Sequence, residues 1–478
     1  MVLRHLARDS AIYGGTDFVS KLIAFLAFPL IAAALSPLAF GALELMLTAT
    51  ALLGMVANCG LNNALQRFYW DGQTEVAHRP VLVSSGFAAL SLLLLAAAAL
   101  GGLALVGYSR WVQDGFAPLG WIGLLAGLVL MAAGQLVQYL LDVTRLHMAP
   151  WRFAGIAVVS RVMTAIAGVA TVVWLGWGLD GLVAAQALVM VAAVPLALCA
   201  VRKDLTWRVD STAVRKLMQF GHPFIYAGLA FWLFGSMDRW LLATMTDVEE
   251  VGIYSVAHRF ASVLLFISIA FGQAWSPLAI KVRTDHPQHY RFLYVDILLA
   301  LLCVMLLLGG VVALFSTELI TWLMPAEYQK AGMPLAALAL GLVLQSTMQV
   351  TALGISIEKK THLFARLSWL AAGLNLILNL AMIPSLGALG AAVATTLSYL
   401  FLTAAYLYYT QRLHPLPVPW RKILVLAAMW LTLAGCLIGL WTGHPMASSL
   451  AWRAGLMLVC LLVCASLMPW RRLLHDRS

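Results

Sequence analysis

The sequence is poor in charged residues. Of its 478 residues, only 10% are Asp, Glu, Lys or Arg, whereas 62% are hydrophobic. Soluble globular domains carry about a quarter charged residues. One water-soluble core cannot enclose so much apolar surface, so the composition predicts an integral membrane protein. The net charge of +10 is therefore not taken to indicate nucleic acid, and no nucleic-acid partner is expected.

The sequence also lacks the short motifs of several enzyme classes. It contains no G-x-x-x-x-G-K-[ST] phosphate loop, no H-E-x-x-H, no G-x-S-x-G and no aspartate-rich cluster. Its six cysteines are scattered through apolar runs, which favours packing over disulfides or zinc ligation. We therefore expect no catalytic residue, no metal site and no cofactor, and a protein that is not an enzyme.

Long apolar runs occupy most of the chain. A bilayer core of about 30 Å takes about 20 residues of helix to cross. Fourteen runs meet that length, near residues 11–35, 40–66, 80–107, 119–144, 153–175, 181–201, 220–245, 251–280, 292–316, 332–357, 363–384, 389–410, 422–442 and 449–470. The first is interpreted as a span rather than a cleaved signal peptide. The predicted fold is an all-α polytopic membrane protein with 14 transmembrane helices.

The basic residues predict the orientation of these spans. Cytoplasmic loops of membrane proteins are enriched in Lys and Arg. Of the 30 basic residues, 23 lie before the first span, in even-numbered loops or in the C-terminal tail, and three lie in or beside odd-numbered loops. Arg145 is counted among the 23, and Arg453 among the three. Both termini are therefore predicted to be cytoplasmic.

Three landmarks recur after about 210 residues and indicate an internal repeat. Six helices per copy give both copies the same orientation, related by an axis along the membrane normal. The predicted domains are an N-terminal lobe (1–201), a cytoplasmic linker (202–219), a C-terminal lobe (220–411) and a terminal helix pair with a basic tail (412–478). The paired landmarks are Tyr13-Gly14 with Phe220-Gly221, Gly41 with Gly252, and Gly178–Gly181 with Gly387–Gly390.

Ionisable residues inside the spans are candidates for function. Each costs about 2.5–3.5 kcal/mol at mid-bilayer, so each should have a partner or face a wet cavity. Asp17 and Lys21 stand four residues apart on one helix face and can pair locally. Arg161 has no acid nearby in sequence and is a candidate cation for a cavity.

The adjacent charges Asp238 and Arg239 point about 100° apart on a helix. Asp238 and Arg259 lie at similar depths of consecutive spans, so a structural Asp238–Arg259 clamp is one interpretation. In that clamp, Arg239 points away from the Asp238–Arg259 pair. Either Arg239 or Arg259 is then a second cation for a cavity.

Carboxamide side chains recur at helical spacing in four of the predicted spans. Each pair alone is explained by hydrogen bonding between helices. Across four spans, a wet cavity is the better explanation, and amides beside cations suit an anionic ligand that carries sugar. The residues are Asn58, Asn62, Asn63, Gln66, Gln135, Gln138, Gln345, Gln349, Asn375 and Asn379.

Residues 220–281 carry a recognisable combination of motifs. They are Phe220-Gly221 with Pro223, Asp238-Arg239, Val251-Gly252-Ile253-Tyr254-Ser255 with Arg259, and Trp275-x-Pro277 with Lys281. This stretch resembles the Wzx-type polysaccharide flippases of the multidrug/oligosaccharidyl-lipid/polysaccharide superfamily.

The resemblance implies a cavity between two lobes that opens alternately to each side of the bacterial inner membrane. The implied substrate is a polyprenyl-pyrophosphate-linked oligosaccharide, moved outward through the lipid bilayer for assembly of a surface polysaccharide, with polymerase and export machinery as expected partners. The expected pyrophosphate ligands are Lys21, Arg239 and Arg259, to which the burial argument adds Arg161. Asp17, Glu44 and Asp238 are expected to gate the cavity or to couple transport to protons or sodium.

Other functions stay open at this point. A lipid II flippase also handles pyrophosphate and sugar, whereas a cation-coupled drug exporter would favour acidic cavity residues. A membrane-embedded polysaccharide polymerase or transferase would need a sizeable catalytic loop, and the loops here are short. A scaffold without transport would have no use for buried cations.

Overall fold

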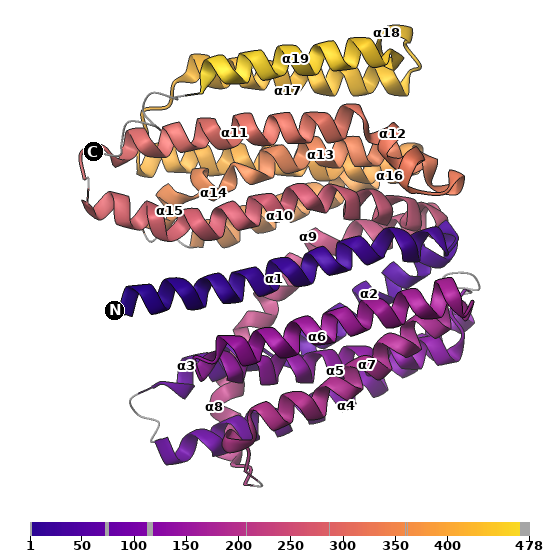
Figure 1. The fold of residues 1–478 in the computed structure, drawn as a ribbon, viewed down its shortest axis with the longest axis vertical. Coiled ribbons are helices and arrows are strands. Elements are labelled where there is room, and N and C mark those ends of the chain that lie inside the picture. The colour runs from indigo at the N-terminus through magenta and orange to yellow at the C-terminus, as the bar shows by residue number, and fades with distance from the viewer. Residues whose placement is uncertain are drawn as a thin grey trace. The chain divides into compact units, whose positions relative to one another are not determined.

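Every element in the described part of the chain is helical (Figure 1). The computed structural model describes residues 2–71, 76–111, 118–206, 208–285, 287–358, 360 and 362–468. The helices are α1 (Val2–Ala33), α2 (Pro37–Asn58), α3 (Leu61–Tyr69), α4 (Arg79–Trp111), α5 (Trp121–Leu146), α6 (Pro150–Val169), α7 (Gly178–Ala200), α8 (Ser211–Gly221), α9 (Pro223–Met245), α10 (Val248–Asp285), α11 (Tyr290–Leu314), α12 (Ser316–Leu323), α13 (Gly332–Ser346), α14 (Met348–Thr351), α15 (Leu353–Ile357), α16 (His362–Leu413), α17 (Trp420–Trp441), α18 (Pro445–Ser448) and α19 (Leu450–Leu467). The predicted basic tail after residue 468 lies outside the described residues.

Within these residues, 12 helical segments are long and apolar enough to cross a membrane. The predicted all-helical polytopic membrane fold is thereby confirmed. α9 is not among the twelve, because Asp238 and Arg239 make it less apolar. α16 is counted once although it has 52 residues.

α16 is two helices joined at a kink. Gly387 has φ 54° and ψ −132°, a backbone conformation that residues with a side chain rarely adopt. Pro384 precedes it and has no backbone N–H to donate. The predicted break between residues 384 and 389 is therefore confirmed as a kink, with the expected spans 363–384 and 389–410 on either side.

The chain divides into two compact units. Unit 1 comprises Met1–Ser236 and Asp247–Gly252, and unit 2 comprises Met237–Thr246 and Ile253–Ser478. In unit 1, α5 packs against α7, and α1 packs against α6. In unit 2, α11 packs against α13, α17 and α19 (Figure 1).

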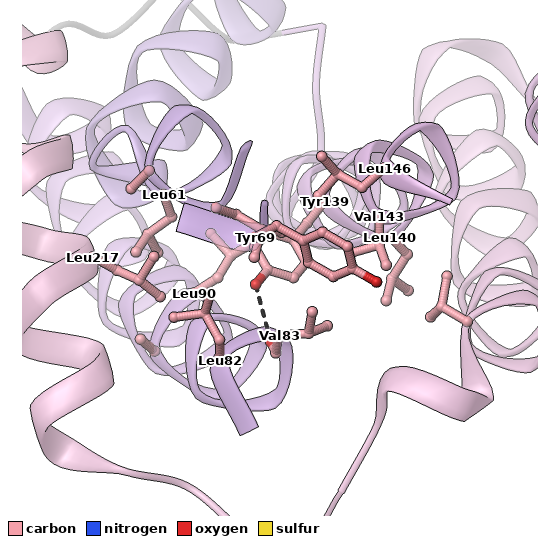
Figure 2. Packing of buried hydrophobic residues seen from close by; sticks show 14 of the residues in the cluster. Leu61, Tyr69, Leu82, Val83, Leu90, Tyr139, Leu140, Val143, Leu146 and Leu217 are labelled. Atoms are coloured by element: carbon pink, nitrogen blue, oxygen red, sulfur yellow. Dashed lines mark hydrogen bonds between the residues drawn. The ribbon is translucent and has the colours of Figure 1, made fainter. Parts of the chain in front are cut away.

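A core cluster in unit 1 forms where α3, α4, α5 and α8 meet. Leu61, Leu90, Leu140 and Leu217 are fully buried there (Figure 2). The buried Tyr139 hydroxyl donates a hydrogen bond of 3.0 Å to the Val83 carbonyl oxygen (Figure 2). The cluster fixes α3 and α5 relative to each other, and both helices supply residues to the site described below.

The terminal helix pair of unit 2 is anchored by an ion pair between a buried arginine and a half-exposed glutamate. Arg453 in α19 is 3% exposed, and its guanidinium donates to both carboxylate oxygens of Glu318 in α12, with Nη1 2.9 Å from Oε2. The same Nη1 donates to the Leu314 carbonyl oxygen at 2.6 Å. Arg453 lies in the first turn of α19, within the predicted span 449–470 and beside the loop with which it was counted.

Candidate binding sites in the two units

Unit 1 contains a cavity of about 650 Å³ between α1, α2, α5, α6 and α7. We call it the cationic cavity because three basic side chains, Lys21, Arg145 and Arg161, line it together with one acid, Asp17. The structure thus brings together Asp17, Lys21 and Arg161 from α1 and α6. Its other polar lining residues are Ser20, Thr50, Gln135, Gln138, Ser160, Thr164 and Gln186.

Arg145 is held in a fixed position at the end of α5. Its guanidinium lies 3.4 Å from Asp142 Oδ1 and 3.8 Å from Asp17 Oδ1. It also lies over the ring of Phe153, 4.3 Å from the centroid, within the range of a cation–π interaction. Two acids and an aromatic ring therefore orient this cation at the cavity wall.

Sequence reasoning missed Arg145 as a site residue, because its position after an apolar run suggested a cytoplasmic loop. The helix extends to Leu146, so Arg145 lies in its last turn. The available signal was Asp142, an acid three residues earlier and therefore on the same helix face.

A second cavity of about 510 Å³ in unit 1 adjoins the first, since Gln135, Gln138 and Arg145 line both. We call it the amide cavity. Carboxamides dominate its polar lining, and α9 contributes aromatic rings. Its other polar and aromatic lining residues are Asn58, Asn62, Asn63, Gln66, Asp142, Phe224 and Phe231.

Hydrogen bonds connect much of the amide cavity's wall. Asn58 Nδ2 donates to Asn62 Oδ1 at 3.0 Å and to Gln135 Oε1 at 3.4 Å. Asp142 accepts from Asn62 Nδ2 at 2.8 Å and from Gln138 Nε2 at 3.2 Å. The two predicted amide stripes therefore meet through Asp142, which is 4% exposed.

In unit 2, Asp238 is at the centre of a buried polar cluster. Asp238 is 2% exposed, and its Oδ2 accepts hydrogen bonds from the hydroxyls of Tyr254 and, at 3.4 Å, Thr395. Asn375 Nδ2 donates to Thr395 Oγ1 at 3.4 Å, and Asn379 Nδ2 donates to Asn375 Oδ1 at 2.9 Å. Among the described residues, Asp238 Oδ1 and Asn379 Oδ1 are buried and accept no hydrogen bond.

The other predicted site residues are distributed between the units. Arg239 belongs to unit 2, is 5% exposed, and lies 5.6 Å from the centroid of the Tyr254 ring. Arg259 also belongs to unit 2 and is half-buried, whereas Glu44 in unit 1 is buried. The four predicted pyrophosphate ligands therefore divide into Lys21 with Arg161 in unit 1, and Arg239 with Arg259 in unit 2. The Asp238–Arg259 clamp stays a prediction.

Comparison with known sequences identifies one matching family. Residues 6–283 match the family described as polysaccharide biosynthesis protein. A similar curated protein is the probable low-salt glycan biosynthesis flippase Agl15 of Haloferax volcanii, 25% identical over 227 residues. That alignment spans 47% of this chain and 48% of the relative, so the chain matches about half the length of that protein.

Solved structures share the fold over most of the chain. The lipid II flippase MurJ in an inward closed conformation aligns with a TM-score of 0.68 and 14% identity, covering 97% of this chain and 99% of that one. An inward-facing multidrug resistance MATE family transporter of the MOP superfamily aligns with a TM-score of 0.61 and 13% identity, covering 82% and 94%. At these identities the likeness concerns the fold.

Proposed function

Because the chain belongs to the polysaccharide biosynthesis protein family, we propose that it is a flippase for polyprenyl-pyrophosphate-linked oligosaccharide. It moves this lipid from the cytoplasmic to the outer leaflet of a bacterial inner membrane by alternating access, and so supplies surface polysaccharide synthesis. The cationic cavity is the observation that carries the proposal. A pyrophosphate has several anionic oxygens, and Lys21, Arg145 and Arg161 offer charge-assisted hydrogen bonds to them.

The cost of burying charge supports this use of the cavity. A cation in a membrane-embedded unit is costly unless it is paired or faces water. Three cations line the cationic cavity together with one acid, Asp17, whose Oδ1 lies 3.8 Å from the Arg145 guanidinium. An anionic headgroup entering the cavity would offset the excess of positive charge, and the same cavity would repel a cationic drug.

We infer 14 spans with both termini in the cytoplasm. The twelve candidate segments become fourteen when α9 is added and α16 is divided at its kink at Gly387. We also propose the domains expected from the repeat, which differ from the two compact units: an N-terminal lobe (1–201), a linker (202–219), a C-terminal lobe (220–411) and a terminal pair (412–478).

We further infer that Asp238 carries the coupling ion. Its cluster holds two buried acceptor oxygens, Asp238 Oδ1 and Asn379 Oδ1, that accept no hydrogen bond among the described residues. A buried acceptor without a donor is costly. A proton on the carboxylate would supply a donor, and a sodium ion, a hard cation that binds oxygen, would be bound by Asp238 Oδ1.

The test is the fate of lipid-linked intermediates in a deletion strain of the native organism. Completed repeat units that accumulate on the cytoplasmic face would support flipping. Units that reach the outer face without being polymerised would contradict it and indicate a polymerase. Accumulation of lipid II in place of longer lipid-linked glycans would assign the transport to peptidoglycan precursor.

A further inference from the structure

The amide cavity differs in charge from the cationic cavity that adjoins it. Its one acid, Asp142, and its one base, Arg145, lie 3.4 Å apart and offset each other. The remaining polar lining consists of carboxamides, each of which both donates and accepts hydrogen bonds. Such a cavity has no preference for an anion and matches an uncharged ligand rich in hydroxyl or acetamido groups.

Two of its amides are available for a ligand. Asn63 and Gln66 are exposed in the cavity wall, and their side chains make no hydrogen bond within the described part of the chain. They stand three residues apart on one face of α3. Cys59 and Gly60, both with positive φ (48° and 65°), break α2 from α3, so α3 begins a new helix at this wall.

The remaining amides form a wall that is already ordered. Asn58, Asn62, Gln135 and Gln138 hydrogen-bond to one another or to Asp142. A ligand that binds here therefore does not have to order these side chains, and the entropy cost of binding is smaller.

Aromatic rings complete the cavity on the side of α9. Phe224 and Phe231 line it and are 42% and 75% exposed. They are seven residues apart, so both rings lie on nearly one face of the helix. Exposed rings beside amides can cover the apolar face of a sugar ring while the amides bind its edge. A volume of about 510 Å³ is typical of pockets for small organic ligands.

We propose that the amide cavity binds an uncharged sugar of the ligand whose pyrophosphate occupies the cationic cavity. This inference rests on the proposed function and assigns the choice of glycan to Asn63, Gln66, Phe224 and Phe231. The three residues shared by both cavities join the two parts of the ligand site. Selectivity among sugars follows because a sugar without a hydroxyl group at the matching position leaves an amide of the cavity without its hydrogen-bond partner.

The experiment measures binding to the purified full-length protein in lipid nanodiscs. The probes are a polyprenyl pyrophosphate without sugar and the same lipid carrying N-acetylglucosamine, glucose or galactose. We expect at least one glycosylated probe to bind about tenfold more tightly than the bare one, since each neutral hydrogen bond contributes about 1 kcal/mol. The double variant Asn63→Ala, Gln66→Ala should lose that advantage and bind the bare probe as wild type does.

Gln219→Ala is the matched control, because Gln219 is an exposed amide on α8 that does not line the amide cavity. Retained binding of the bare probe also demonstrates that the double variant is folded. Equal wild-type affinity for all four probes would overturn the sugar site while leaving pyrophosphate binding intact. A double variant that binds all four probes equally more weakly than wild type would also overturn the sugar site. A wild type that binds none of the four would instead overturn the proposed function.

Discussion

Gly41 and Gly252 lie against each other in a reciprocal helix crossing within unit 1. A Cβ atom on Gly41 would overlap the carbonyl oxygen of Val248, and a Cβ atom on Gly252 would overlap the carbonyl oxygen of Pro37. Pro37 and Val248 are the first residues of α2 and α10, and each precedes its glycine by four positions. The two backbones therefore touch, and neither position has room for a side chain.

Replacing Gly41 with alanine is expected to destabilise the protein by about 1–3 kcal/mol, because a backbone carbonyl cannot move aside as a side chain can. Thermal unfolding of the purified variant measures this. Gly155→Ala in α6 is the control, since a Cβ atom there meets nothing within 4 Å. A Gly41→Ala protein as stable as the Gly155→Ala protein would contradict the close crossing.

Neutralising Lys21 or Arg161 with glutamine is expected to weaken binding of polyprenyl pyrophosphate about tenfold in each case. Charge-assisted hydrogen bonds contribute about 1.5–3 kcal/mol, and 1.4 kcal/mol corresponds to tenfold. The same binding assay in nanodiscs provides the measurement. Arg152→Gln, an exposed arginine of α6 that does not line the cationic cavity, should bind as wild type does. Equal affinity in all four proteins would rule out this cavity as the pyrophosphate site.

Arg239→Ala and Arg259→Ala are each expected to abolish polysaccharide export while the protein remains at wild-type level in the membrane. Both cations belong to unit 2, and the resemblance to Wzx-type flippases implies that they bind pyrophosphate. Surface polysaccharide on cells that express each variant is the measurement. Full production in both variants would confine the pyrophosphate site to Lys21, Arg145 and Arg161.

Asp238→Asn is expected to remove the dependence of transport on an ion gradient, because an amide of the same shape has no charge to bind a proton or sodium. Transport into proteoliposomes is measured with a sodium gradient at constant pH and with a pH gradient at constant sodium. The comparison identifies which ion drives transport. Glu327→Gln, an exposed acid of the same unit, serves as the control. A variant that responds to both gradients as wild type does would assign Asp238 a structural role.

The thermal stability of the protein is expected to fall on acidification below about pH 6.5, in part through His414. Burial lowers the pKa of His414, aided by Arg291 and Arg283 and opposed by Glu358, which lies 3.3 Å from Nδ1. The unfolded chain therefore binds a proton that the folded protein does not, so stability declines as pH falls from the ordinary histidine pKa of about 6.5 toward the lower folded value.

His414→Gln should flatten this pH dependence, measured as unfolding temperature between pH 5 and 8. Its neighbour in space, Tyr290, whose hydroxyl lies 2.8 Å from Nε2, provides a second variant, Tyr290→Phe, that keeps the histidine. A His414→Gln protein with an unchanged pH profile would show that other groups determine the acid sensitivity.

Features that depend on local sequence were predictable. The kink at Gly387 follows from a proline and a glycine within four residues, and the charges within the spans identified Lys21 and Arg161. Contacts between distant segments were not. Asp238 accepts a hydrogen bond from the hydroxyl of Thr395, 157 residues away. No helical periodicity in the sequence predicts a contact between residues so far apart. Gly41 and Gly252 were recognised as repeat landmarks, but their mutual contact depends on how two helices cross.

The ion pair of Arg453 and Glu318 has a consequence for biosynthesis. The two residues are 135 positions apart, so Glu318 leaves the ribosome long before its partner does. Until α19 emerges, Glu318 in α12 and the Leu314 carbonyl oxygen at the end of α11 lack the guanidinium that binds them both. This contact can therefore form only after the last helix has been synthesised, and a chain terminated before Arg453 is expected to be less stable in the membrane.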